Sequence, residues 1–234
     1  SRLSVRSAMK KITDFLFENA DEQYQKFHCS LIPTIASSRV IGVRTPCLRA
    51  FAKQLYKSGD FSAFLNELPH KYYEENNLHA FILEQVSDFD DALLKTEQFL
   101  LFIDNWATCD CFVPKCFKKN KKQLLSHIYA WIESEHTYTV RYAVGLLMKL
   151  FLDADFDVSY LSAVANIKSD DYYINMMLAW YFQTALAKQY DAAVLFLTEK
   201  RLPKFVHNKA IQKSVESLRM TKEQKDFLRS LKIK

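Results

Sequence analysis

Two residues in the middle of the chain combine an aromatic ring with a carboxylate at helical spacing. They are Trp106 and Asp110, in the stretch Ile103-Asp-Asn-Trp-Ala-Thr-Cys-Asp110. Residues four apart on a helix lie on the same face, so an indole would stand beside an acid. Neither a core helix nor a fully solvated face favours that combination, which is more typical of a cleft that binds something. The structural alternative is a partly buried indole next to an aspartate that caps a helix or is hydrogen-bonded, with no chemical role.

Two further candidate residues, Arg141 and Trp180, lie in largely apolar segments. Arg141 has Gly145, Met148 and Leu152 on its helical face, and burying a guanidinium there without a partner is costly. We therefore expect it to meet a carboxylate, a carbonyl or a ligand phosphate, and an internal Arg–Asp pair is the structural alternative. Trp180 lies in Met-Met-Leu-Ala-Trp-Tyr-Phe, where the residues alone favour a role in the core.

The usual sequence signatures of metal, nucleotide and nucleophilic chemistry are absent. The chain has no GxSxG, HExxH, P-loop or dinucleotide-binding fingerprint, and its 3 glycines could hardly build a phosphate-cradling loop. Its 6 histidines lack metal-ligand spacing, and its 5 cysteines include no CxxC pair. We therefore expect no metal site, no disulfide framework and a reducing, cytoplasmic environment. No run of 18 apolar residues predicts a membrane span.

The net charge of +5 is unevenly distributed. Residues 198–234 hold 11 Lys/Arg and 4 Asp/Glu, a surplus of +7, whereas residues 1–197 hold 21 and 23, a balance of −2. A second basic cluster directly follows the Trp106/Asp110 stretch and consists of Lys115, Lys118, Lys119, Lys121 and Lys122. Clustered cations attract phosphate backbones by releasing counterions, although a solvated lysine face gives the same pattern. Charge alone leaves both interpretations open.

The elements that must position these residues are helices. Few Gly and Pro and many Leu, Ala, Lys, Glu and Gln favour helices with short connections, so we predict an all-α protein. Apolar periodicity places the helices at residues 7–19, 21–31, 46–58, 60–68, 74–86, 90–102, 106–117 with a break near Pro114, 121–132, 139–152, 158–167, 170–188, 190–197, 203–218 and 221–231. Residues 34–44 show no helical period. Thr45-Pro46 predicts an N-cap followed by Pro at the first helical position, and Thr221-Lys-Glu-Gln224 predicts a capping box.

Helices of alternating length with short connections are typical of stacked helical hairpins. We predict that residues 1–234 form one α-solenoid domain, whose curvature would supply a concave groove. An irregular helical bundle is the alternative.

Five segments, in this order along the chain, resemble one known family. They are Val43-Arg-Thr-Pro-Cys-Leu-Arg49, Asp104-Asn-Trp-Ala-Thr-Cys-Asp110, Val140-Arg-Tyr-Ala-Val-Gly145, Tyr173-Ile-Asn-Met-Met-Leu-Ala-Trp180 and His207-Asn-Lys-Ala-Ile-Gln-Lys213. From end to end, the chain resembles the AlkD-type DNA alkylation repair family of HEAT-like-repeat DNA glycosylases. The resemblance implies a right-handed α-solenoid of HEAT-like repeats whose concave, basic face holds duplex DNA. It also implies hydrolysis of the N-glycosidic bond of cationic N3- or N7-alkylated purines, without a metal or organic cofactor.

The resemblance assigns roles to four residues. Asp110 matches the family's catalytic aspartate, and Trp106 and Trp180 match its two cleft tryptophans. Arg141 matches the cleft arginine that contacts the DNA backbone near the lesion. In such a site an anionic carboxylate stabilises the oxocarbenium-like sugar, indole faces hold the developing cation, and the guanidinium fixes a phosphate.

Two features depart from the family pattern. Gln183 lies one turn beyond Trp180, where family glycosylases tend to have a further basic residue, and residues 33–44 resemble a loop where the family has helices near the DNA. The first function we consider is therefore a monomeric glycosylase that acts on alkylated duplex DNA. The alternative is a weak or inactive relative that binds DNA or a protein as a helical-repeat module.

Overall fold

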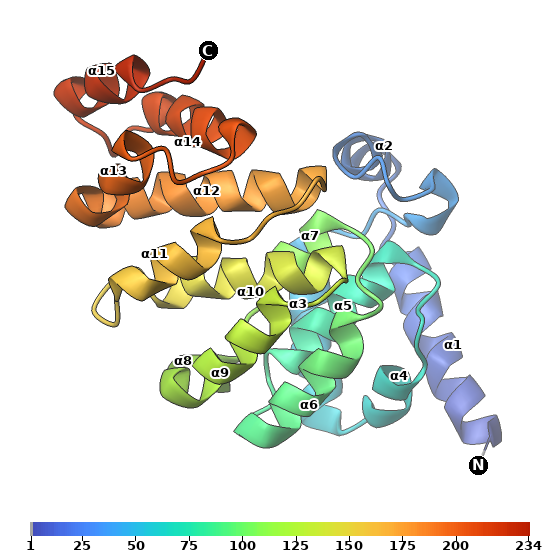
Figure 1. Ribbon diagram of the computed structural model, residues 1–234. Helices are drawn as coiled ribbons and strands as arrows, with labels where there is room; N and C mark the ends of the chain where they lie inside the picture. The colour runs from blue at the N-terminus through green and yellow to red at the C-terminus, as the bar shows by residue number, and fades with distance from the viewer. Residues whose placement is uncertain (1) are drawn as a thin grey trace. The chain divides into compact units, whose positions relative to one another are not determined.

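The computed structural model describes residues 2–234, and the regular secondary structure in that range is entirely helical. Fifteen α-helices and one 3-10 helix in these residues are joined by short connections (Figure 1). The predicted all-α fold is confirmed. Within the described residues, no helix combines the length and the apolar character needed to cross a bilayer.

The chain divides into two compact units, one ending at Asn120 and the other beginning at Lys121. The helices of the first unit are α1 (Arg2–Glu18), α2 (Glu22–Leu31), the 3-10 helix (Ser37–Arg39), α3 (Thr45–Ser58), α4 (Ser62–Asn66), α5 (Tyr73–Leu83), α6 (Phe89–Leu100), α7 (Trp106–Asp110) and α8 (Lys115–Lys119). Those of the second are α9 (Lys121–Ile132), α10 (Thr137–Leu150), α11 (Val158–Ala165), α12 (Tyr172–Lys188), α13 (Tyr190–Thr198), α14 (Lys204–Glu216) and α15 (Lys222–Ser230). One continuous domain over residues 1–234 stays a prediction.

The second unit contains a layer of three parallel helices, α10, α12 and α14, against which α9, α11 and α13 pack (Figure 1). Arg141 bonds to Tyr173 and Gly145 lies against Met177, so α10 and α12 are in contact at an offset of 32 residues (141 to 173 and 145 to 177). The rings of Tyr172 and Phe205 lie 6.5 Å apart, which places α14 against α12 at an offset of 33 residues (172 to 205). Similar helices therefore recur at a nearly constant interval.

The first unit contains a comparable row, α3, α5 and α7. The Arg49 guanidinium lies 4.0 Å from the centre of the Phe81 ring, 32 residues later (49 to 81), and Thr108 bonds to Asn77, 31 residues earlier (77 to 108). Recurring hairpins of this kind agree with the predicted α-solenoid. Its right-handed superhelix and its concave basic groove stay predictions.

Most of the boundaries predicted from sequence agree to within three residues, and three predictions need correction. The predicted helix at residues 106–117 is two helices, α7 and α8, separated by residues 111–114. α1 already includes residues 2–6, which precede its predicted start at Ser7. The N-cap of α3 is Arg44 rather than Thr45, which is itself helical, and the Arg44 side chain makes no capping bond because a guanidinium has no acceptor atom. The predicted capping box is confirmed: Gln224 N–H donates to Thr221 Oγ1 at 3.1 Å, and Thr221 N–H donates to Gln224 Oε1 at 3.0 Å.

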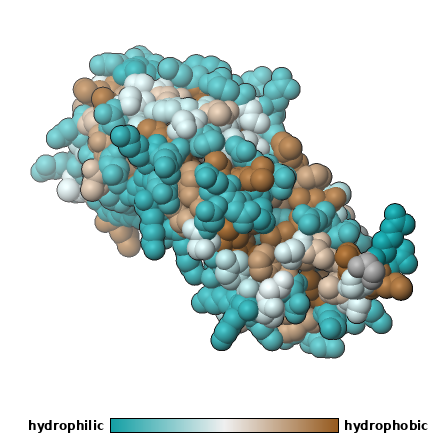
Figure 2. Space-filling model, turned by 90° about the horizontal axis from the view of Figure 1, so that it is seen from below, coloured by the Kyte–Doolittle hydropathy of each residue, from teal (hydrophilic) through white to brown (hydrophobic). Residues whose placement is uncertain are grey.

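Not all large hydrophobic side chains are buried. Phe17, Phe27, Tyr172 and Phe205 are exposed, and Figure 2 shows hydrophobic residues scattered among hydrophilic ones on one face of the molecule. Single exposed aromatic residues are common in soluble domains.

Candidate functional site

A buried polar network fixes the start of α7, whose first and last residues are Trp106 and Asp110. Asn105 caps the helix, because its Oδ1 accepts a bond from the Thr108 N–H at 2.8 Å. The Asn105 Nδ2 donates to Thr108 Oγ1 at 3.0 Å, and Thr108 Oγ1 donates to Asn77 Oδ1 at 2.7 Å. Because all three side chains are buried, this network orients α7 firmly on α5.

An ion pair fixes the chain directly after α7. Arg49 on α3 donates to the Cys111 carbonyl at 2.9 Å and to Glu84 Oε2 at 2.6 Å. The other oxygen of Glu84 accepts the Val113 N–H at 3.2 Å. Charge-assisted bonds from one guanidinium to two acceptors constrain direction as well as distance. Asp110 is therefore presented by a helix that is held at both ends.

Trp106 is partly buried and is tied to the end of α2. Its indole Nε1–H donates to the Leu31 carbonyl at 2.9 Å. The ring also packs against a buried cluster formed by Ile32, Ile35, Val40 and Tyr73. The part of the structural alternative that concerns a partly buried, hydrogen-bonded indole is thus confirmed. A capping role for Asp110 is wrong, because the residues that cap α7 and α8 are Asn105 and Pro114, whereas a hydrogen-bonded Asp110 stays a prediction.

The loop that supports this cluster is held by one buried carboxylate. Glu74, on α5, is 1% exposed; its Oε1 accepts the Gly42 N–H at 2.7 Å and its Oε2 accepts the Ile41 N–H at 2.9 Å. Burial raises the pKa of Glu74, and the two amide donors oppose that rise. Gly42 has φ +95° and lies against α2, where a Cβ would come within 2.5 Å of Gln25 Cβ. Residues 34–44 are non-helical apart from one 3-10 turn, as predicted.

Arg141, in the second unit, is almost completely buried on α10. Its Nη1 donates to the Tyr173 carbonyl at 2.8 Å, in the first turn of α12. The expectation that a buried guanidinium would meet a carbonyl is confirmed for this nitrogen. Asp171 organises the same helix start by accepting the N–H groups of Tyr173 and Ile174 at 2.8 and 3.0 Å. Arg141 therefore joins α10 to the capped end of α12.

Trp180 lies two turns further along α12 and is only partly buried, so a wholly internal role is wrong. It lines an open hollow of about 360 Å³ that we call the Trp180 hollow. The other lining residues are Gln183, Lys213, Glu216, Ser217 and Arg219. Lys213 and Arg219 thus bring two cations to the surroundings of Gln183, which is uncharged.

The four residues predicted from sequence fall into two groups. Trp106 and Asp110 lie one helical turn apart on α7 in the first unit, whereas Arg141 and Trp180 lie on the adjacent helices α10 and α12 of the second. Their convergence in a single cleft stays a prediction. Among the described residues, no group of three or more His, Cys, Asp or Glu side chains is arranged to hold a metal ion.

Sequence reasoning missed the residues that position α7. One signal was available: Glu74-Glu-Asn-Asn77 follows Tyr73, the first residue of α5, and all eleven residues of this helix are buried. Four consecutive polar residues in the first turns of a mainly apolar helix predict buried bonding partners, because an unpaired buried polar group is costly. Arg49 lies within a segment that carries the family resemblance, but the sequence does not show that its partner is the end of α7.

The protein is an all-helical repeat protein. In each unit its candidate site residues lie on neighbouring helices of one layer: α5 and α7 in the first unit, and α10 and α12 in the second. The sequence model of the family described as DNA alkylation repair enzyme matches residues 4–214. The match covers most of the chain, so this protein belongs to the DNA alkylation repair enzyme family. The predicted family is confirmed, and membership gives the chain a role in DNA repair with DNA as its partner. The comparison with curated proteins gives no significant match.

Proposed function

We propose that this protein is a DNA glycosylase that removes cationic N3- or N7-alkylated purines from duplex DNA. The observation that carries the proposal is the Trp106/Asp110 pair, presented on a short helix that is fixed at both ends. Catalysis by charge complementarity requires such prior fixation, because a carboxylate that must reorganise during the reaction stabilises little. Membership of the family supports alkylated DNA as the substrate, and the proposed specificity for N3- and N7-alkylated purines follows the resemblance described above.

The proposed reaction needs little chemical assistance from the enzyme, because an alkylated purine that carries a positive charge is already a good leaving group. The bond between C1′ and the purine nitrogen breaks, and its electron pair leaves with the base, which thereby loses its positive charge. The sugar becomes oxocarbenium-like, and Asp110 stabilises it as an anion while Trp106 and Trp180 offer indole faces. Water then adds to C1′ and loses a proton, for which Asp110 is the candidate acceptor. Lys213 and Arg219, which line the hollow around Trp180, would bind the flanking phosphates, and the buried Arg141 would hold the start of α12.

The direct test is base release from methylated duplex DNA under single-turnover conditions with enzyme in excess. We expect the wild type to release 7-methylguanine or 3-methyladenine, and Asp110→Asn to reduce the rate by about 100-fold or more. Asp60→Asn removes a carboxylate of the same unit that is exposed, and it should leave the rate unchanged. Intact DNA after prolonged incubation with excess wild-type protein would refute the proposal.

A second candidate is a helical-repeat module that binds DNA or a protein without excision. Two observations favour it: Arg141 is buried and bonded to the Tyr173 carbonyl, and Gln183 adds no charge beside Trp180. This candidate predicts that no base is released and that Asp110→Asn leaves DNA affinity unchanged. DNA binding that weakens steeply with salt, without base release, would identify the DNA-binding form of the module.

A further inference from the structure

A groove in the first unit runs along one face of α1. The residues of α1 that line it recur at spacings of three and four from Ser4 to Glu18, so they form one continuous stripe on the helix. Phe51 and Leu55, one turn apart on α3, line it from the other side. We call this open groove of about 700 Å³ the α1 groove. At about 1.5 Å per residue the stripe is about 21 Å long, which matches the length of a helix of about 15 residues.

The middle of the α1 groove is apolar. Phe15 on α1 stacks on Phe51, with ring centroids 3.7 Å apart and ring planes inclined by 23°. Ile12 and Phe51 are buried, whereas Phe15 and Leu55 are only partly buried. The last two therefore keep apolar surface that a partner can cover, and an apolar groove beside a helix is a common site for a second, amphipathic helix.

The rim of the α1 groove is acidic. Asp14 and Glu18 lie one turn apart on α1, and Asp60 lies in the turn that follows α3. All three side chains are exposed. Lys11 is the one cation among the described residues that line the groove, so three acids and one lysine give a net charge of −2. The chain as a whole has a net charge of +5, so this groove has the opposite sign.

Other acids of the first unit are already paired with cations. Asp21 pairs with Arg44 at 2.9 Å, and Glu84 pairs with Arg49 at 2.6 Å. In contrast, none of the three carboxylates of the α1 groove forms an ion pair within residues 2–234. Their negative charge therefore remains available to cations of a partner.

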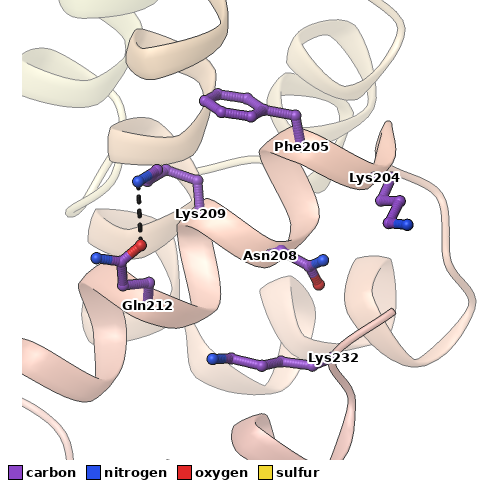
Figure 3. A pocket seen from close by; sticks show the side chains of 6 residues that line it. All are labelled: Lys204, Phe205, Asn208, Lys209, Gln212 and Lys232. Atoms are coloured by element: carbon purple, nitrogen blue, oxygen red, sulfur yellow. Dashed lines mark hydrogen bonds between the residues drawn. The ribbon is translucent and has the colours of Figure 1, made fainter. Parts of the chain in front are cut away.

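The charge of the α1 groove disfavours DNA as its occupant, because its carboxylates repel phosphates. A hollow of the second unit has the opposite character. It is open, has a volume of about 570 Å³ and is lined mainly by residues of α14 (Figure 3). Three of its six lining residues are lysines, namely Lys204, Lys209 and Lys232, and none is acidic. The α1 groove therefore differs in kind from the basic surfaces of this protein, and its chemistry suits a cationic, partly apolar protein segment.

We propose that the α1 groove is a docking site for a basic amphipathic helix of a partner protein. Apolar side chains at positions i, i+3 or i+4, and i+7 of that helix cover Phe15 and Leu55. Lysine or arginine side chains on its flanks pair with the carboxylates of the rim, which orients the helix and selects it over acidic ones. Neither Trp106 nor Asp110 lines this groove, so the proposal does not depend on base excision.

The test is fluorescence anisotropy with the intact chain and a labelled peptide of about 15 residues that carries leucines on one helical face and lysines on both flanks. A second peptide replaces every lysine by glutamate, and a third replaces every leucine by serine. We expect the first peptide to bind at least about tenfold more tightly than either of the others, because only it matches both the apolar middle and the acidic rim. Its affinity should fall as salt is added, since exposed ion pairs are screened.

The groove variant Asp14→Asn/Glu18→Gln/Asp60→Asn removes the acidic rim and keeps the shape of the side chains. An exposed ion pair changes an equilibrium constant by about 1.5- to 5-fold, so we expect this variant to bind the first peptide about tenfold more weakly than the wild type. Its binding should also depend less on salt.

The matched control, Glu22→Gln/Glu67→Gln/Asp90→Asn, removes the same charge from exposed acids of the first unit that do not line the α1 groove. It should bind the first peptide as tightly as the wild type. Equal affinities of the groove variant and the control, or equal binding of the lysine and glutamate peptides, would overturn the proposal. So would a dimer in sedimentation equilibrium that the groove variant abolishes, because the occupant would then be a second copy of this chain. Circular dichroism and a thermal melt establish that both variants fold.

Discussion

Replacing Glu74 by Gln tests how the loop of residues 34–44 supports Trp106. A glutamine oxygen can accept one of the two N–H groups, from Ile41 or Gly42, and its NH₂ group then faces the other. The charge-assisted bond that disappears is worth about 1.5–3 kcal/mol, and the N–H left unpaired in a buried site costs about 1–3 kcal/mol more. Glutamine avoids the desolvation that raises the pKa of Glu74, which offsets part of this loss. We therefore expect Glu74→Gln to lower the free energy of unfolding by about 2–4 kcal/mol.

The assay is urea denaturation at pH 7, combined with hydrogen exchange at the amides of Ile41 and Gly42. The midpoint should fall with little change in slope, and both amides should exchange faster than in the wild type. Glu67→Gln makes the same chemical change at an exposed position of the same unit, where we expect less than about 0.5 kcal/mol. If Glu74→Gln lowers the free energy of unfolding by less than about 1 kcal/mol, or leaves the exchange of both amides unchanged, Glu74 does not hold the Ile41 and Gly42 amides as described.

Two further predictions concern stability. Gly145→Ala should stabilise the protein by about 0.5–1 kcal/mol, because the new Cβ has Met177 Cε at 3.6 Å as its nearest neighbour and the helix loses a flexible residue; a lower thermal midpoint would be evidence against this packing. Acid should destabilise the fold, because burial lowers the pKa of His70 from 6.5 to about 4 and holds that of His79 well below 6.5. Below pH 6.5 the unfolded chain takes up protons that the folded protein refuses, so the free energy of unfolding should fall by up to about 3 kcal/mol between pH 6.5 and 4 from His70 alone. Urea denaturation at pH 7, 6 and 5 checks this, and a flat profile would be inconsistent with neutral, buried histidines.

The helices could be predicted from sequence because their signals are local. Apolar periodicity, proline and glycine positions and the Thr221 capping box depend on residues within one or two turns. The repeat could not be predicted in the same way. Its interval of about 32 residues appears only through contacts such as Arg141 to Tyr173 and Arg49 to Phe81, which join unlike residues and leave no internal similarity to detect.

The candidate site was accessible from sequence only in part. Trp106, Asp110, Arg141 and Trp180 were selected by unusual context and by family resemblance, and the structure places each on the predicted helix. What the sequence could not provide was the partner of each polar group. The bond from Arg49 to the Cys111 carbonyl joins residues 62 positions apart, and a main-chain acceptor has no signature in the amino-acid type.

The repeat architecture explains why these polar residues separate into two kinds. Helices of one layer pack on one another, so a polar residue facing a neighbouring helix must find a partner there, whereas one facing outward remains available to a ligand. Glu74 and Arg141 are of the first kind, because both are buried with protein acceptors or donors in place. Trp180 and Lys213 are of the second, because both line an open hollow. By this criterion Arg141 has a positioning role, because its bond to Tyr173 holds the start of α12, the helix that carries Trp180.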